Sequence, residues 1–143
     1  MSNLLSLLLN AALVLTAIYV HYEVLSRMSR LLPVLPLKPR SRVMVGVLGV
    51  MFAHCLEVSL FAAGYWLSAD LSQGFLTGHF NGGFGDYIYY SFATFTTLGF
   101  GDIVPKGHFR WLTGIEALTG FVLITWSASF LFLEMSQNWR HDQ

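Results

Sequence analysis

Residues 96–102, which read TTLGFGD, decide the fold of this chain of 143 residues. Gly99 and Gly101 alternate with bulky residues here, and an apolar segment at residues 87–98 leads into them. That segment is too short for a helix that crosses a bilayer, which needs about 20 residues. Non-helical backbone at membrane depth occurs only where it is buried in protein or lines a watery cavity. The stretch therefore predicts a re-entrant segment that lines a pore.

Three longer apolar runs surround this segment, at residues 4–22, 43–67 and 111–133. Each is long enough to cross a bilayer as a helix. Only 11% of the residues are charged and 55% are hydrophobic, whereas a soluble domain carries about 25% charged residues. The composition excludes an ordinary soluble domain. The single cysteine, Cys55, excludes a disulfide scaffold and a cysteine zinc site.

Basic residues gather between the first two apolar runs, where the chain also has three prolines, Pro33, Pro36 and Pro39. The positive-inside rule predicts that this segment is cytoplasmic, with the N terminus and residues 68–110 outside and the tail inside. The proline spacing favours an extended path. We expect the basic side chains to lie near anionic lipid heads, and their place between apolar runs argues against nucleic acid as a partner. They are Arg27, Arg30, Lys38, Arg40 and Arg42.

Two spans around a short helix and a glycine-rich loop resemble the pore domain of tetrameric potassium channels, over about residues 43–135. The resemblance implies an all-α integral membrane fold with three transmembrane helices, a re-entrant pore helix and a selectivity-filter loop, assembled as a homotetramer. It places an outer helix at 43–67, a pore helix at 86–97, the filter at 97–102 and an inner helix at 109–135. Outside this pore domain we expect an additional N-terminal transmembrane helix at 1–25, a basic cytoplasmic linker at 26–42 and a cytoplasmic tail at 136–143.

The resemblance also implies which residues contact the ion. The carbonyl oxygens of the first four filter residues would bind K⁺, the Thr97 hydroxyl would complete the innermost site, and the side chains of Leu98 and Phe100 would pack behind the filter. Glycine fits here because carbonyls that face one axis need backbone conformations that other residues avoid. The expected filter residues are Thr97, Leu98, Gly99, Phe100, Gly101 and Asp102, with K⁺ at Thr97, Leu98, Gly99 and Phe100 and Asp102 at the outer mouth.

The chain departs from the common family pattern around the filter. Phe100 replaces the more frequent tyrosine, and Tyr89 and Tyr90 stand where many members have tryptophan. Ala93 stands where some members carry a glutamate behind the filter. In the family, aromatic residues around the filter often form a hydrogen bond to it, and this bond cannot form here in the usual way. The carboxylate pair with Asp102 cannot form in the usual way either.

Small and hydroxylated residues recur at helical spacing in the third run, which suits a helix face that lines a watery cavity. Gly120 lies where the family commonly has an inner-helix hinge, whereas we expect Gly114 to serve helix packing. The cavity-lining candidates are Val122, Thr125, Ser129 and Leu133.

Three ionisable residues, His54, Glu57 and Glu116, lie within apolar runs, which makes each a candidate functional group. His54 and Glu57 are three residues apart on one helix face and can pair. By helical rise, both carboxylates should face the back of the pore helix, where hydroxyls could donate to them. The candidate donors are Tyr90, Ser91 and Thr94.

A haem bound by His21 and His54 is an alternative of another class, a cytochrome anchor. Helical rise places His21 at the cytoplasmic end of the first run and His54 about 16 Å inside that face, so the two depths disagree. We therefore expect no cofactor besides the permeant K⁺. Without a zinc-protease HExxH pattern or a spaced Ser/His/Asp set, we expect no enzymatic activity.

The sequence favours a potassium-selective channel that passes K⁺ passively across the membrane, most simply the plasma (inner) membrane. Two alternatives remain open: a non-selective cation channel and a nonconducting, channel-like scaffold subunit.

Overall fold

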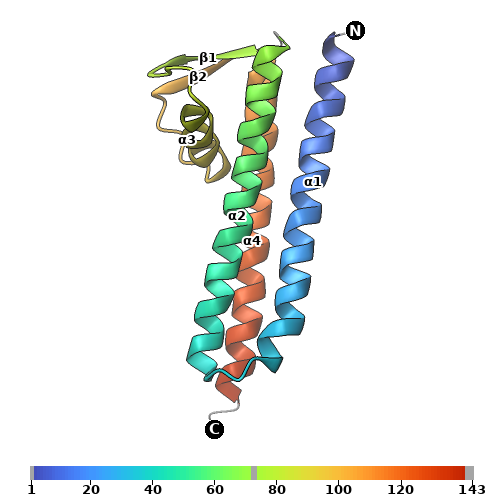
Figure 1. The fold of residues 1–143 in the computed structure, drawn as a ribbon, viewed down its shortest axis with the longest axis vertical. Coiled ribbons are helices and arrows are strands. Elements are labelled where there is room, and N and C mark those ends of the chain that lie inside the picture. Colours follow the sequence, from blue (N-terminus) through green and yellow to red (C-terminus); the bar gives the residue numbers. More distant parts are fainter. Residues whose placement is uncertain (1, 72–73, 141–143) are drawn as a thin grey trace.

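The computed structural model describes residues 2–71 and 74–140, with the side chains of residues 4–71 and 74–136. Three long helices run side by side: α1 (Ser2–Leu31), α2 (Pro39–Asp70) and α4 (Phe109–Arg140) (Figure 1). All three are long and apolar enough to cross a membrane, which confirms the three predicted spans. A shorter helix, α3 (Phe84–Phe95), packs against α2 and α4 near one end of the bundle (Figure 1). This is the re-entrant helix expected at residues 86–97, displaced by two residues.

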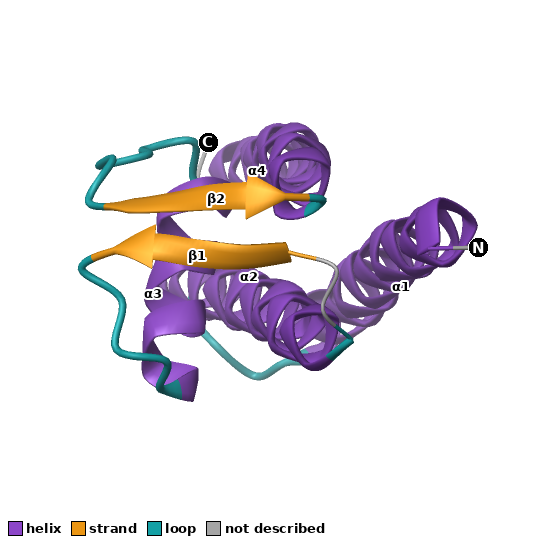
Figure 2. Cartoon of the chain, turned by 90° about the horizontal axis from the view of Figure 1, so that it is seen from above, coloured by secondary structure: helices purple, strands orange, loops and turns teal. Residues whose placement is uncertain are grey.

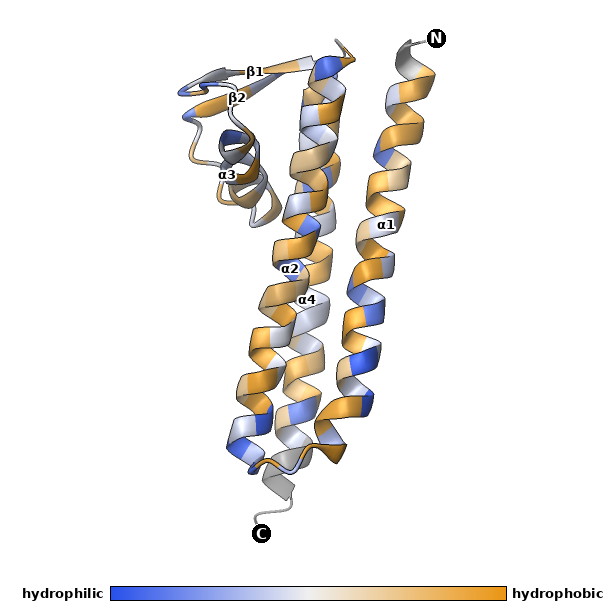
Figure 3. Cartoon of the chain, viewed as in Figure 1, coloured by the Kyte–Doolittle hydropathy of each residue, from blue (hydrophilic) through white to orange (hydrophobic). Residues whose placement is uncertain are grey.

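The surface of the bundle is apolar, as a chain surrounded by lipid requires. Leu15, Leu48 and Phe132 are each more than 60% exposed in the single chain, and apolar residues predominate along all three long helices (Figure 3). Exposed apolar surface on this scale is rare on soluble monomers. The core lies between α2, α3 and α4, where Phe61, Tyr65 and Phe95 are fully buried.

The expected extended linker at 26–42 is wrong in its conformation. Residues 26–31 continue α1, a 3₁₀ turn η1 (Leu32–Val34) follows, and α2 already begins at Pro39. The prolines do not break these helices, because Pro33 and Pro39 occupy first-turn positions. There a missing N–H costs nothing and the fixed φ of proline favours the helix.

Most basic residues of this connection lie at the end of the bundle away from α3 (Figure 3). Arg27 pairs with Glu23 at 3.1 Å, and Arg42 donates to the Leu35 carbonyl oxygen at 3.0 Å. The N terminus lies at the same end as α3 (Figure 1). The basic connection and the N terminus thus lie at opposite ends of the bundle, while the side of the membrane that each end faces stays a prediction.

A two-stranded sheet, which the sequence did not predict, lies at the other end of the bundle, next to α3. Strands β1 (Gly74–Gly78) and β2 (Ile103–Gly107) are antiparallel, with Gly78 opposite Ile103 (Figure 2). Gly78 has φ +102°, and a Cβ there would lie 2.1 Å from the Asp102 carbonyl oxygen. Glycine thus permits the close approach that joins the loop before α3 to the loop after it.

Candidate functional site

Every second residue of the loop after α3 has left-handed backbone. The φ angles are +59° at Thr97, +54° at Gly99 and +81° at Gly101. This is the alternation that carbonyls of successive residues need in order to face one side. The conformation predicted for the two glycines is confirmed, while ion binding stays a prediction.

Thr97 is the position that sequence reasoning missed, because a β-branched residue rarely adopts positive φ. Such a conformation costs on the order of 1–3 kcal/mol and persists only where surrounding structure enforces it. Backbone hydrogen bonds hold it here: Thr97 N–H donates to the Thr94 carbonyl at 2.9 Å, and Gly99 N–H donates to the Ala93 carbonyl at 3.0 Å. The loop is therefore fixed to the last turn of α3.

The side chains expected to pack behind the filter remain open in the single chain. Leu98 is 60% exposed and Phe100 is 63% exposed. The ring of Phe100 stacks on Tyr89, with centroids 6.3 Å apart and planes 5° apart. Next to the loop is a cavity of about 360 Å³, between α3, the loop, β2 and α4. One chain thus leaves an apolar surface and a hollow side by side.

A tyrosine of α3 forms a hydrogen bond to the outer end of the loop. The Tyr89 hydroxyl donates to Asp102 Oδ2 at 2.8 Å. This hydrogen bond raises the pKa of Tyr89 above its ordinary value. On the other side, the His79 N–H donates to the Asp102 carbonyl at 2.9 Å. Asp102 is therefore held from both α3 and the β1 side, although Phe100 lacks a hydroxyl and Ala93 lacks a carboxylate.

Glu116 lies behind α3, where the sequence placed it, while its predicted role in bracing the filter stays a prediction. It is fully buried, accepts from the Tyr65 hydroxyl of α2 at 2.7 Å, and accepts from Ser91 of α3. Ser91 also lies 2.9 Å from the Val58 carbonyl oxygen. The other two expected donors are not used: the Tyr90 hydroxyl pairs with Thr113 at 2.7 Å, and among the described residues Thr94 makes no hydrogen bond to Glu116. One carboxyl group thus joins α2, α3 and α4.

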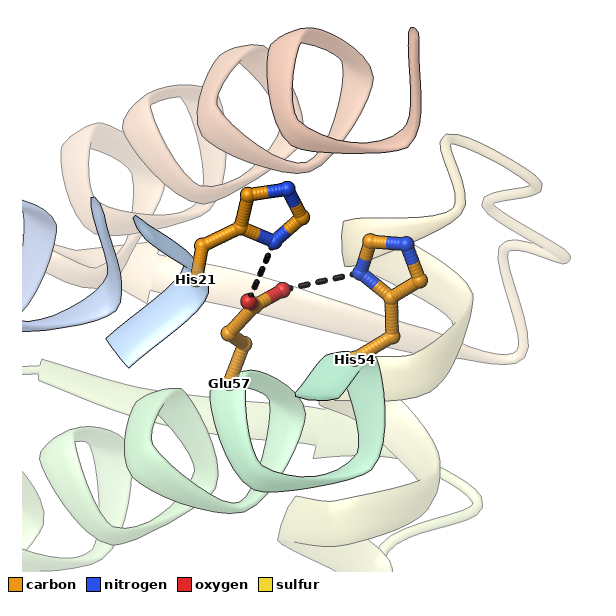
Figure 4. Close-up of side chains that lie close together, drawn as sticks. All are labelled: His21, His54 and Glu57. Atoms are coloured by element: carbon orange, nitrogen blue, oxygen red, sulfur yellow. Dashed lines mark hydrogen bonds and ion pairs between the residues drawn. The ribbon is translucent and has the colours of Figure 1, made fainter. Parts of the chain in front are cut away.

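The expectation that Glu57 faces the pore helix is wrong. Its carboxylate oxygens lie 2.8 Å from His54 Nδ1, which confirms the predicted pair, and 2.8 Å from His21 Nδ1 (Figure 4). The depth argument that separated His21 from His54 is also wrong. Because α1 continues to Leu31, His21 lies well inside that helix, level with His54.

The inner-helix candidates point away from the rest of the chain. Val122 is 50% exposed, Leu133 is 58% exposed, and Thr125 and Ser129 are exposed and bond only to carbonyls of their own helix among the described residues. Their exposure leaves this face available to line a cavity, which stays a prediction.

The two inner-helix glycines have different surroundings. A Cβ at Gly120 would lie 2.0 Å from the Phe95 carbonyl oxygen, so this glycine lets α4 touch the end of α3. A Cβ at Gly114 would meet no described atom within 4 Å. Within one chain the packing role expected of Gly114 thus belongs to Gly120.

A comparison with protein families matches residues 43–137 to the family described as "Ion channel". The match includes α3, the loop and most of α2 and α4, but it excludes α1. No curated protein and no solved structure matches the chain.

Proposed function

The chain belongs to the two-transmembrane, potassium-channel-like ion channel family, and from this we propose that it is a potassium-selective channel built from four identical chains. The observation that carries the proposal is the alternation of positive φ at Thr97, Gly99 and Gly101 within the TTLGFGD loop. In rings of such loops, backbone carbonyl oxygens replace the hydration shell of K⁺.

The proposed binding sites use the carbonyl oxygens of Thr97, Leu98, Gly99 and Phe100, with the Thr97 hydroxyl at the inner end. Helix α3 ends at Phe95, directly before these residues. The C-terminal end of a helix carries the equivalent of about half a negative charge, which favours a cation beside it. The pore helix therefore adds to the attraction of the carbonyl ring.

Several chains are needed, because one chain supplies one strand of the filter. The exposed side chains of Leu98 and Phe100 and the neighbouring cavity of about 360 Å³ are the surfaces that adjacent chains would cover. The family resemblance makes four the expected number. We place the assembly in the plasma (inner) membrane, with the filter mouth and the N terminus outside and the basic end in the cytoplasm, since Arg27, Arg30, Lys38, Arg40 and Arg42 follow the positive-inside rule.

Cation flux from liposomes that contain the purified protein tests this function. We expect vesicles loaded with K⁺ to lose it down its gradient while vesicles loaded with Na⁺ retain theirs. Equal loss of both ions would instead indicate a non-selective cation channel. Loss of neither ion, from protein shown to be folded, would indicate a nonconducting scaffold subunit.

A further inference from the structure

Away from the filter, a group of polar side chains fills the contact between the three long helices. His21 comes from α1, His54 and Glu57 come from α2, and Ser127 comes from α4. His21 and Glu57 are fully buried, Ser127 is 3% exposed and the His54 side chain is 19% exposed. We call these four residues the histidine cluster. It lies outside the conduction path proposed above.

The two imidazole rings are arranged alike. Each Nδ1 atom lies 2.8 Å from one oxygen of the Glu57 carboxylate, Oε1 for His21 and Oε2 for His54 (Figure 4). Each Nε2 atom faces Ser127 Oγ, at 3.4 Å from His21 and 3.2 Å from His54. The rings stack with centroids 5.4 Å apart. Both rings therefore present one nitrogen to the carboxylate and the other to the same hydroxyl.

A count of hydrogens shows that this arrangement lacks a positive charge. The four contacts need four hydrogens, whereas two neutral imidazoles and one hydroxyl supply three. The carboxylate is also uncompensated, because among the described residues no lysine or arginine bonds to Glu57. A buried carboxylate without a balancing positive charge costs several kcal/mol. The cluster therefore lacks one positive charge, which a proton or a bound metal ion can supply.

We propose that His21, His54 and Glu57 bind a divalent transition metal ion of the zinc class. One potential ligand atom from each lies within 4.8 Å of the other two, and two histidines with one glutamate are a known zinc ligand set. Zinc lies about 2.0–2.2 Å from nitrogen and oxygen ligands, so tetrahedral ligands are about 3.4 Å apart. The present 2.8 Å contacts need to widen by only roughly half an ångström.

Ser127 supports the site through the Nε2 atoms of both histidines. When a metal takes the Nδ1 lone pairs, each neutral ring carries its hydrogen on Nε2, and both can donate to the two lone pairs of Ser127 Oγ. Every contact is then satisfied without an additional proton. A hydrogen-bond acceptor behind each ligating histidine is the usual support of metal sites.

The site gives α1 a role that the ion channel match does not cover. A bound metal would fasten α1 to α2 at His54, whose ring centroid lies 5.7 Å from that of Phe95 at the end of α3. The metal would thus hold the additional helix against the support of the filter loop. The proposal concerns binding alone and does not depend on which ion the chain conducts.

The direct test is zinc titration calorimetry on detergent-solubilised protein without a histidine tag. All variants carry Cys55→Ser, since this exposed thiol next to His54 could bind zinc itself. We expect one zinc per chain. Glu57→Gln and His21→Asn should each weaken zinc binding at least about 100-fold, and Ser127→Ala about 10- to 100-fold. His108→Gln, which changes a histidine outside the cluster, should bind zinc like the parent.

A cobalt experiment on the parent keeps the proposal testable even if the variants do not fold. Co²⁺ bound by the three side chains and one water should give the visible absorption bands of a four-coordinate nitrogen and oxygen site, and added zinc should remove them. Absence of these bands, or equal zinc affinity in the parent and folded Glu57→Gln, would overturn the proposal. The histidine cluster would then be a hydrogen-bonded network that holds a proton.

Discussion

At Gly99 the proposed function rests on the freedom of one backbone angle. Its φ of +54° is open to glycine, whereas a residue with a Cβ is strained there by about 1–2 kcal/mol. No described atom lies within 4 Å of an added Cβ, so the strain comes from the backbone alone. We expect an alanine to relieve this strain by changing to negative φ. The change would turn one carbonyl oxygen away from the side that the other loop carbonyls face.

We therefore expect Gly99→Ala to abolish K⁺ flux while the tetramer still assembles. Liposome flux and the mass of the detergent-solubilised particle measure the two effects separately. Normal flux through an assembled variant would mean that the loop is not the conduction path.

Tyr89 supports the mouth of the filter by its bond to Asp102. We expect Tyr89→Phe to lose K⁺ current faster than the parent when external K⁺ is lowered, because Asp102 then lacks its partner on α3. Time courses of current in bilayers at high and low K⁺ measure this.

The same bond implies a dependence on alkaline pH. Since the bond raises the pKa of Tyr89, its stabilising effect is complete below the ordinary tyrosine pKa of about 10 and is lost as the pH rises through the higher value. The K⁺ current of the parent should therefore decline faster at strongly alkaline pH. The current of Tyr89→Phe should decline at the same rate at both pH values. Identical time courses in the two proteins would exclude this role.

At the scale of elements, α3 depends on what lies behind it. Glu116 accepts from Tyr65 and contacts Ser91, and Ser91 has one hydroxyl hydrogen for two acceptors, the carboxyl group and the Val58 carbonyl. A glutamine at position 116 can donate to Ser91 and accept from Tyr65, which meets both needs. An alanine removes the group that joins α2, α3 and α4 and costs about 0.5–1.5 kcal/mol for each lost hydrogen bond. Ser91 then keeps the Val58 carbonyl, and the Tyr65 hydroxyl keeps Thr113 at 3.2 Å.

Glu116→Gln should therefore conduct like the parent, whereas Glu116→Ala should lower the temperature at which the tetramer dissociates or reduce the open probability. Thermal dissociation and single-channel recording of both variants beside the parent measure this. If the alanine variant matches the parent in both assays, Glu116 does not brace the filter.

The contact between α3 and α4 depends on Gly120. Alanine there would press its Cβ against the Phe95 carbonyl, so we expect Gly120→Ala to destabilise the fold and lower the thermal transition clearly. Gly114→Ala is the matched control on the same helix, because it meets open space in the chain and should stabilise α4 by up to about 1 kcal/mol. Equal transitions for the two variants would contradict the assigned contact.

Local signals in the sequence predicted part of this arrangement. The length of the apolar runs predicted α1, α2 and α4. The glycines of the loop predicted positive φ at Gly99 and Gly101. The helical linker was missed because proline in a first turn resembles proline in an extended chain. The positive φ of Thr97 and the β1–β2 pair were missed because contacts distant in the sequence impose them.

Contacts between side chains of different helices were predictable only where the depth of each residue below the end of its helix could be counted correctly. Glu116 was placed behind α3 because both its own helix and the pore helix have clear outer ends. His21 was misplaced because the polar residues after Tyr22 suggested the end of a span, whereas the helix continues to Leu31. The link from His21 to Glu57 therefore needed the structure.

At the scale of the whole molecule, the proposed function needs more than one chain. The filter loop, the open face of α4 and the cavity next to the loop all lie on surfaces that one chain leaves uncovered. In the proposed assembly, a ring of identical chains would close the loops around an axis and cover these surfaces at the same time. Selective conduction would then be a property of the assembly, so the decisive measurement must be made on it.

That measurement is the reversal potential of purified protein in a planar bilayer with unequal K⁺ and Na⁺ on the two sides. We predict that it follows the K⁺ gradient and does not move when only Na⁺ is changed. A reversal potential near zero with K⁺ on one side and an equal concentration of Na⁺ on the other would contradict potassium selectivity.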